Sequence, residues 1–137
     1  MRWVTIVDMQ TQGDLKNVLL ITDDAPEIKI MSATLKKAGF HVSNVPFANS
    51  ALHTLLESGE TIDVAIIDTP GPQDTELLQQ LHDYDPNLRM LFIAPGEPAR
   101  NIGPAGHVRG YIHKPVRRAQ LLGNVLKLIA SPSTFAA

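Results

Sequence analysis

The sequence predicts one α/β domain built on a doubly wound parallel sheet. Short apolar runs alternate with helical segments along the chain, the order expected when crossover helices join the strands of a sheet. Three runs, within 18–22, 63–68 and 90–93, are almost continuously apolar, as central strands covered on both faces should be. A chain of 137 residues is long enough for one such domain and its core.

The first half of the chain holds two strand–helix units. The run 18–22 is followed by a helix over 26–38, and a more mixed strand over 40–45 is followed by a helix over 49–58 that stops at Gly59. The apolar stripe of the first helix consists of Ile28, Met31, Leu35 and Ala38. Its polar side consists of Glu27, Lys29, Lys36 and Lys37. The second helix should point inward with Leu52, Leu55 and Leu56.

The second half repeats the alternation. The strand 63–68 leads through a Pro-Gly-Pro turn to a helix over 75–84, for which Asp74 is the expected N-cap. Strands over 90–93 and 108–112 and a last helix over 116–130 follow. The inward residues of these two helices are Leu77, Leu78, Leu81, Leu121, Leu122, Val125, Leu128 and Ile129.

The character of each strand predicts its place in the sheet. The first, third and fourth strands are the most apolar and belong in the middle, whereas the mixed second and fifth belong at the edges. That arrangement is the strand order 2-1-3-4-5, the flavodoxin-like fold. In this fold ligands bind at the carboxyl ends of the strands, near the point where the order reverses.

Composition excludes several classes of function. A net charge of −2 offers no basic field for nucleic acid, and no apolar stretch is long enough to cross a membrane. Without cysteine the chain has neither disulfides nor thiolate metal sites. We therefore expect a cytoplasmic protein with neither nucleic acid nor membrane as a partner.

Charged residues stand at the carboxyl ends of three predicted strands. Asp23 and Asp24 follow the first strand, Asp68 ends the third, and Lys114 follows the fifth. The predicted topology brings these strand ends together. Acidic oxygens suit Mg²⁺, a carboxylate can accept a phosphoryl group, and a lysine can neutralise it. The constellation thus predicts a Mg²⁺-dependent phosphoryl-acceptor site.

From about residue 17 to residue 130 the chain resembles a receiver domain (CheY-like) of the response regulators of two-component signalling. Each matching segment is weak alone, but together they stand in the right order and spacing on the right fold. The matching segments are 18–24 with the acidic pair, 64–68 with the acceptor strand, Pro72 in the following loop, and 110–115 with the lysine.

The resemblance implies a role for each site residue. Asp68 would be the phosphoacceptor in a phosphorelay, and Lys114 would neutralise a phosphoryl oxygen. Asp24 and Asp68 would bind Mg²⁺ directly, Asp23 mainly through water, and Pro70 through its backbone carbonyl. The donor would be a phosphohistidine on a histidine kinase or phosphotransfer protein. A homodimer is a further expectation, and enzymatic activity would be limited to self-catalysed phosphoryl acceptance and autodephosphorylation.

Other positions depart from the family's pattern. Ala94 stands where the family has a Thr or Ser that bonds the phosphoryl group, a contact worth about 1.5–3 kcal/mol. Pro95 and Pro70 lack the backbone N–H that those positions otherwise offer. Tyr111 fits the family's switch aromatic, although an aromatic residue of an edge strand explains it equally well. Switching is therefore expected to be atypical.

The ends of the chain and one connection also carry expectations. We divide the sequence into an N-terminal arm or linker over 1–16, a receiver domain over 17–130 and a disordered tail over 131–137. The fourth helix of the family falls within 97–106, where two prolines and two glycines predict an abbreviated or irregular helix.

Two alternatives to a phosphorylated receiver stay open at this point. A pseudo-receiver would keep the fold as a phosphorylation-independent protein-interaction module, which the residues at positions 70, 94 and 95 favour. A small phosphatase of the haloacid-dehalogenase type is disfavoured, because its chemistry needs a second Asp two residues after the nucleophile and Pro70 stands there.

Overall fold

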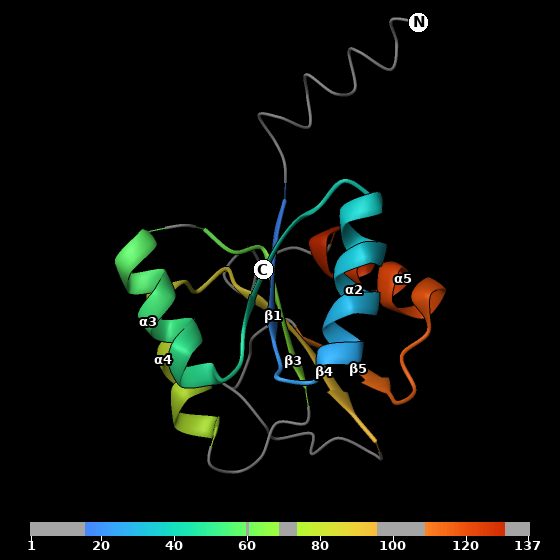
Figure 1. Ribbon diagram of the computed structural model, residues 1–137. Coiled ribbons are helices and arrows are strands. Elements are labelled where there is room, and N and C mark those ends of the chain that lie inside the picture. The colour runs from blue at the N-terminus through green and yellow to red at the C-terminus, as the bar shows by residue number, and fades with distance from the viewer. Residues whose placement is uncertain (1–15, 60, 69–73, 96–108, 131–137) are drawn as a thin grey trace, which may run out of the picture.

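The computed structural model describes residues 16–59, 61–68, 74–95 and 109–130. Strands and helices alternate along this part of the chain up to the fourth strand, as the apolar pattern predicts (Figure 1). The elements are β1 (Asn17–Ile21), α2 (Ala25–Lys37), β2 (His41–Val45), α3 (Ala48–Ser58), β3 (Val64–Asp68), α4 (Thr75–Tyr84), β4 (Arg89–Ala94), β5 (Arg109–His113) and α5 (Arg118–Ala130).

The five strands form one parallel sheet in the order β2-β1-β3-β4-β5. This confirms the flavodoxin-like arrangement, with the apolar strands β1, β3 and β4 inside and the mixed strands β2 and β5 at the edges. The order reverses between β1 and β3, so the carboxyl ends of these two neighbouring strands define the place where a site is expected.

Helices cover both faces of the sheet and divide the core into two clusters. In Figure 1, α3 and α4 lie on one side of the sheet, and α2 and α5 lie on the other. Alternate residues of each central strand enter opposite clusters, because successive side chains of a strand point to opposite faces. In β1, for example, Leu19 packs on the α3/α4 side and Leu20 packs on the α2/α5 side. Burial on both faces explains why these strands are continuously apolar.

Helix ends follow the local sequence. Asp24 caps α2 by accepting a hydrogen bond from the backbone N–H of Glu27 at 3.1 Å, and Pro26 lies in the first turn, where its missing N–H is harmless. The helix α3 ends at Gly59, whose φ of +68° is in the left-handed region that glycine adopts without strain. Because only three residues separate the end of β1 from the start of α2, the first turn of α2 lies at the carboxyl edge of the sheet.

Three details differ from the sequence-based expectations. Leu56 is 61% exposed, because it lies about 100° around the helix from Leu55, which is buried. Ala38 is exposed at the C-cap of α2, beyond the stripe that packs inward. Asp74 occupies the N-cap position of α4, but its side chain makes no capping hydrogen bond. The side chain of Leu52 is outside the described part.

Some expectations concern residues that the structure does not describe. They are the arm up to residue 15, Pro70 with its loop, the abbreviated helix within 97–106, and the tail over 131–137. Within the described ranges, every helix is too short or too polar to cross a membrane.

Candidate functional site

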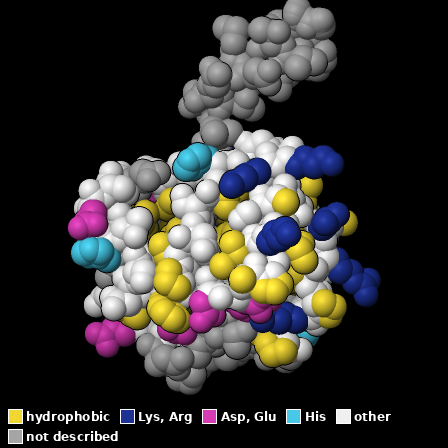
Figure 2. Space-filling model, in the orientation of Figure 1, with side chains coloured by type: hydrophobic (Ala, Val, Ile, Leu, Met, Phe, Trp, Pro, Cys, Tyr) yellow, Lys and Arg dark blue, Asp and Glu magenta, His cyan; other side chains and the backbone are white. Residues whose placement is uncertain are grey.

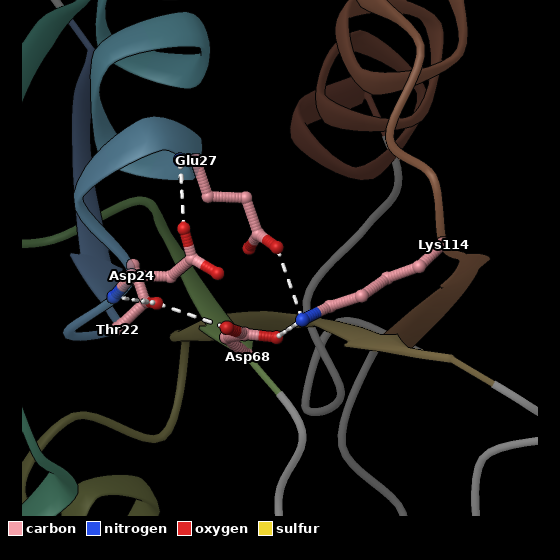
Figure 3. A network of polar contacts seen from close by, with 5 residues as sticks. All are labelled: Thr22, Asp24, Glu27, Asp68 and Lys114. Atoms are coloured by element: carbon pink, nitrogen blue, oxygen red, sulfur yellow. Dashed lines mark hydrogen bonds and ion pairs between the residues drawn. The ribbon is translucent and has the colours of Figure 1, made fainter.

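Three strand ends meet at the carboxyl edge of the sheet. Asp68 is the last residue of β3, Asp24 lies between β1 and α2, and Lys114 follows β5 (Figure 3). In Figure 2, Asp and Glu side chains gather along the lower edge of the face, which is the end of the molecule where β1 runs into α2. The predicted convergence of these residues is therefore present in the structure.

The ammonium group of Lys114 lies between two carboxylates. Its Nζ is 2.8 Å from Oδ1 of Asp68 and 3.0 Å from Oε2 of Glu27. The three side chains are largely withdrawn from water, with exposed fractions of 26% for Lys114, 16% for Glu27 and 10% for Asp68. Solvent therefore screens these charges less than it screens those of a surface ion pair. Removing one charged group would leave the others without compensation in a partly buried site.

Two further hydrogen bonds hold the acids from the side of β1. The hydroxyl of Thr22 donates to Oδ2 of Asp68 at 3.0 Å, and the hydroxyl oxygen accepts from the backbone N–H of Asp24 at 3.1 Å. In a capping box, the carboxylate of Glu27 would reach back to that N–H. Because Thr22 occupies the N–H, the Glu27 carboxylate extends to Lys114 instead (Figure 3).

The pKa values of two groups at the site, Glu27 and Lys114, lie above their ordinary values. Burial raises the pKa of Glu27 above its ordinary value, and the nearby carboxylates of Asp68 and Asp24 raise it further, against the lowering effect of Lys114. Burial lowers the pKa of Lys114, but its hydrogen bonds with Asp68 and Glu27 outweigh this effect and raise the pKa overall. Lys114 is thus cationic at neutral pH. Its positive charge only partly offsets the effects of burial and of the neighbouring carboxylates on Glu27.

The acidic groups could hold a metal ion. One carboxylate oxygen from each of Asp24, Glu27 and Asp68 lies within 4.8 Å of the others. Oε1 of Glu27 is buried and has no hydrogen-bond partner among the described residues. Three carboxylates face one ammonium group, so negative charge is in excess, and oxygen ligands are those that Mg²⁺ prefers. The residues present therefore fit Mg²⁺.

A cavity of about 510 Å³ adjoins the site between α2 and the segment that joins β5 to α5. Asp24, Glu27 and Lys114 form its polar wall, and Ile30 and Val116 contribute to its apolar wall. Lys114, whose ammonium group contacts Asp68, lines this cavity together with Asp24 and Glu27, so a ligand in the cavity would lie beside charged residues.

The end of β4 contributes its backbone to the site. The carbonyl of Ala94 accepts a hydrogen bond from the backbone N–H of Lys114 at 2.8 Å, while its methyl group offers no donor. Pro95 follows and is exposed. Tyr111 is partly buried against the α3/α4 side of the core, with its ring 5.7 Å from that of Phe92 at an angle of 47°. Its packing suits an edge-strand aromatic, and its switch role stays a prediction.

Comparison with the sequence-based site shows both agreement and omissions. Asp68, Asp24 and Lys114 come together as expected, whereas Asp23 is exposed and is not one of the three clustered carboxylates, so its water-mediated role stays a prediction. Pro70 lies outside the described residues. From the sequence, Glu27 was placed on the polar side of its helix and was overlooked as a site residue. The available signal was its position three residues after Asp24, which is the spacing of a capping box.

Comparison with known proteins agrees with the geometry. No protein-family model matches the chain. A response regulator receiver protein from Brucella abortus (strain 2308), CpdR, is 27% identical over 118 residues, which are 84% of this chain and 98% of that protein. The crystal structure of a response regulator receiver protein from Sinorhizobium medicae WSM419 is 27% identical, covers 85% of this chain and 96% of its own, and has a TM-score of 0.71.

A third likeness concerns the fold. The receiver domain of a sensor histidine kinase from Pseudomonas aeruginosa PAO1, solved with a magnesium ion coordinated in the active site cleft, has a TM-score of 0.71 at 17% identity. The match covers 85% of this chain and 99% of that chain. In its strand order and in its convergent acids and lysine, the chain has the fold of response-regulator receiver domains and is similar to these proteins.

Proposed function

We propose that the chain accepts a phosphoryl group on Asp68, with Mg²⁺, as a step of a phosphorelay. The observation that carries this proposal is the contact of 2.8 Å between Lys114 Nζ and Asp68 Oδ1. It joins a nucleophile to a cation at a strand edge where Asp24 and Glu27 also converge. A purely structural ion pair would need neither the added acids nor the excess negative charge that they create.

The chemistry is a transfer between two groups. An oxygen of the Asp68 carboxylate attacks the phosphorus of a phosphohistidine, the P–N bond breaks, and the imidazole leaves with its electron pair and takes up a proton. The product on this chain is an acyl phosphate. Lys114 offsets the negative charge that arrives with the phosphoryl group. Mg²⁺, when bound, would offset the charge of the carboxylates and of the phosphoryl oxygens.

The ligands of the metal would come from this chain's acidic cluster. Asp24 and Asp68 match the family's direct ligands, and Glu27 adds a buried oxygen that has no other partner among the described residues. Asp23 would act through water, and the Pro70 carbonyl would complete the set. These last two assignments rest on the resemblance.

The partner would be a histidine kinase or a phosphotransfer protein that presents a phosphohistidine. The cavity beside Lys114 supports approach from the α2 side, where Ile30 is 42% exposed at its rim. Charge on this side is mixed: Figure 2 shows Lys and Arg side chains mainly over α2 and α5 and acidic ones along the lower edge. Pairing of two copies of the chain stays a prediction.

The decisive experiment uses a small acyl phosphate such as acetyl phosphate. Incubation with this donor and Mg²⁺ should add one phosphoryl group, visible by intact mass spectrometry, and Asp68→Asn should remain unmodified. Chelation of Mg²⁺ should prevent the addition. Absence of the adduct in the unaltered chain, together with absence of beryllofluoride binding, would reject the proposal and leave a phosphorylation-independent module.

A further inference from the structure

Thr22, which directly follows β1, is a buried threonine whose main chain and side chain both make hydrogen bonds. Thr22 is 4% exposed. Its backbone N–H donates to the carbonyl of Val45 at 3.0 Å, and its own carbonyl accepts from the side-chain amide of Asn44 at 3.2 Å. The main chain at this point is thus fixed against β2, and the hydroxyl has a defined position.

The direction of its two hydrogen bonds follows from the chemistry of their partners. Oγ1 of Thr22 is 3.1 Å from the backbone nitrogen of Asp24 and 3.0 Å from Oδ2 of Asp68. An N–H can only donate, so the hydroxyl oxygen is the acceptor toward Asp24. Its single proton is then left for Asp68, whose ionised carboxylate can only accept. The Thr22 hydroxyl therefore accepts a hydrogen bond from Asp24 and donates one to Asp68.

The carboxylate of Asp68 is consequently held at both oxygens. Lys114 contacts Oδ1 at 2.8 Å, and Thr22 contacts Oδ2 at 3.0 Å. The two donors come from opposite ends of the chain and approach different oxygens, which opposes rotation of the carboxylate about its terminal bond. Asp68 is 10% exposed, so water competes weakly with either donor.

We propose that Thr22 is a positioning residue for phosphoryl acceptance: its hydroxyl holds Oδ2, so that Oδ1, beside Lys114, is the oxygen presented to the phosphoryl donor. This inference rests on the proposed function of Asp68. Well-oriented reacting groups react much faster than loosely held ones, and the orientation here is established before the donor arrives. The same hydroxyl also positions the main chain of Asp24, because its oxygen accepts a hydrogen bond from the backbone N–H of Asp24.

This role differs from that of the hydroxyl missing at position 94. Strands β1 and β4 lie on opposite sides of β3, so Thr22 and Ala94 flank Asp68 from different directions. The Thr22 hydroxyl contacts the acceptor carboxylate itself and acts on the rate of transfer. A hydroxyl at position 94 would contact the phosphoryl group after transfer and act on its lifetime. The two effects are separable in one kinetic experiment.

The test compares variants that differ by one group. Thr22→Val keeps the shape and removes the hydroxyl, and Thr22→Ser keeps the hydroxyl. Thr34→Val is the matched control, because the Thr34 hydroxyl on α2 donates to the Ile30 carbonyl at 2.8 Å, away from Asp68. With acetyl phosphate and Mg²⁺, Thr22→Val should be phosphorylated about 10-fold more slowly, the loss expected for one hydrogen bond to a charged group. The Ser variant should recover most of the rate, and the control should match the unaltered chain.

A second measurement needs neither phosphate nor metal. In NMR spectra, the amide proton of Asp24 and the carboxyl carbon of Asp68 should shift in Thr22→Val and return in Thr22→Ser. If Thr22→Val does not fold, Thr22→Ala carries the same comparison with a smaller side chain. A merely structural threonine would lower stability without moving the Asp68 carbon or the rate of the folded protein.

The outcomes separate the two proposals. If the unaltered chain takes no phosphoryl group, the proposed function fails, and the positioning role for transfer fails with it. If the unaltered chain is phosphorylated and folded Thr22→Val reacts at the same rate, the role of Thr22 is overturned while the proposed function stands. An unchanged Asp68 carbon in Thr22→Val likewise overturns it. A slower rate with shifted resonances, both recovered by Ser, supports it.

Discussion

The ends of β1 and β4 flank the same strand, β3, yet they serve Asp68 in different ways. The β1 end supplies side chains: the Thr22 hydroxyl contacts Asp68 directly, and Asp24 and Glu27 follow within one helical turn. The β4 end supplies a backbone carbonyl, that of Ala94, which holds the main chain of Lys114 at 2.8 Å. Apart from Lys114, the side chains that surround Asp68 thus come from the β1 side.

Under the proposed function, binding a phosphoryl group and reporting its presence would depend on separate parts of this edge of the sheet. The β1 side, together with Lys114, contains the groups that orient and neutralise the acceptor. On the β4 side, the family has a Thr or Ser whose hydroxyl bonds the phosphoryl group. This chain has Ala94 at that position, which has no hydroxyl. Three substitutions, Lys114→Met, Ala94→Thr and Glu27→Gln, test this contrast.

The largest effect should come from Lys114→Met. This change removes the cation that lies 2.8 Å from Asp68, and with it the charge that offsets the incoming phosphoryl group. We expect phosphorylation by acetyl phosphate to slow by about 100-fold, as when one electrostatic donor is removed from an enzyme site. Intact mass measured over time gives the rate. Lys114→Arg, which keeps the charge, should lose less; equal losses would show that charge is not the property required.

The same substitution should also affect stability. Without the ammonium group, Asp68 and Glu27, at 10% and 16% exposure, face each other without a counter-charge. We expect the free energy of unfolding to fall by about 2 kcal/mol, less than for a fully buried pair because the site is partly open. Urea denaturation of the metal-free protein measures this. Adding Glu27→Gln should recover part of the loss, and a Lys114→Met protein of unaltered stability would contradict the dependence.

A smaller effect should follow from adding the missing group to β4. Ala94→Thr places a hydroxyl where the family's pattern has one, and a hydrogen bond to the charged phosphoryl group should lengthen the life of the adduct by about 10-fold. Decay of the adduct after removal of the donor measures this. Ala94→Val has the same shape without the hydroxyl, and a lifetime equal to that of the Thr variant would attribute the gain to bulk.

The smallest effect should be the pH dependence of Glu27→Gln. Burial raises the pKa of Glu27 in the folded chain above its ordinary value of 4.5. Its contribution to stability is therefore complete below that ordinary value and is lost as pH rises through the raised pKa of the folded state. Gln copies the neutral form, so the metal-free variant should equal the unaltered chain at low pH and become slightly more stable toward neutral pH. Urea denaturation across this range checks the sign, and a variant that weakens as pH rises would reverse it.

Most of the fold could be predicted because local patterns carry it. Continuous apolar runs marked the buried strands, and their contrast with the mixed strands gave the observed order. The predictions failed where a helix turned a side chain outward: Leu56 adjoins Leu55 in sequence but not in space. Hydrophobicity alone does not say which of two adjacent leucines faces the sheet.

The site could be predicted in part for the same reason. Asp24, Asp68 and Lys114 stand at strand ends, and a parallel sheet brings strand ends together. Glu27 was overlooked because helical periodicity predicts only that its side chain lies away from the apolar stripe. It does not predict which distant residue that side chain contacts. Thr22 was overlooked because a threonine that ends a strand is ordinary, and its partner Asp68 is 46 residues away.

The alternation of elements, the order of strands and the edge at which the acids and the lysine meet could be read from the sequence, because they follow from periodicity and from the rules of parallel sheets. How the charges pair with one another emerged from the folded arrangement. It placed Lys114 between Asp68 and Glu27, and it joined Thr22 to both Asp24 and Asp68. Hydrogen bonds and ion pairs depend on ångström distances and on the direction of each donor, and these exist only once the strands are packed.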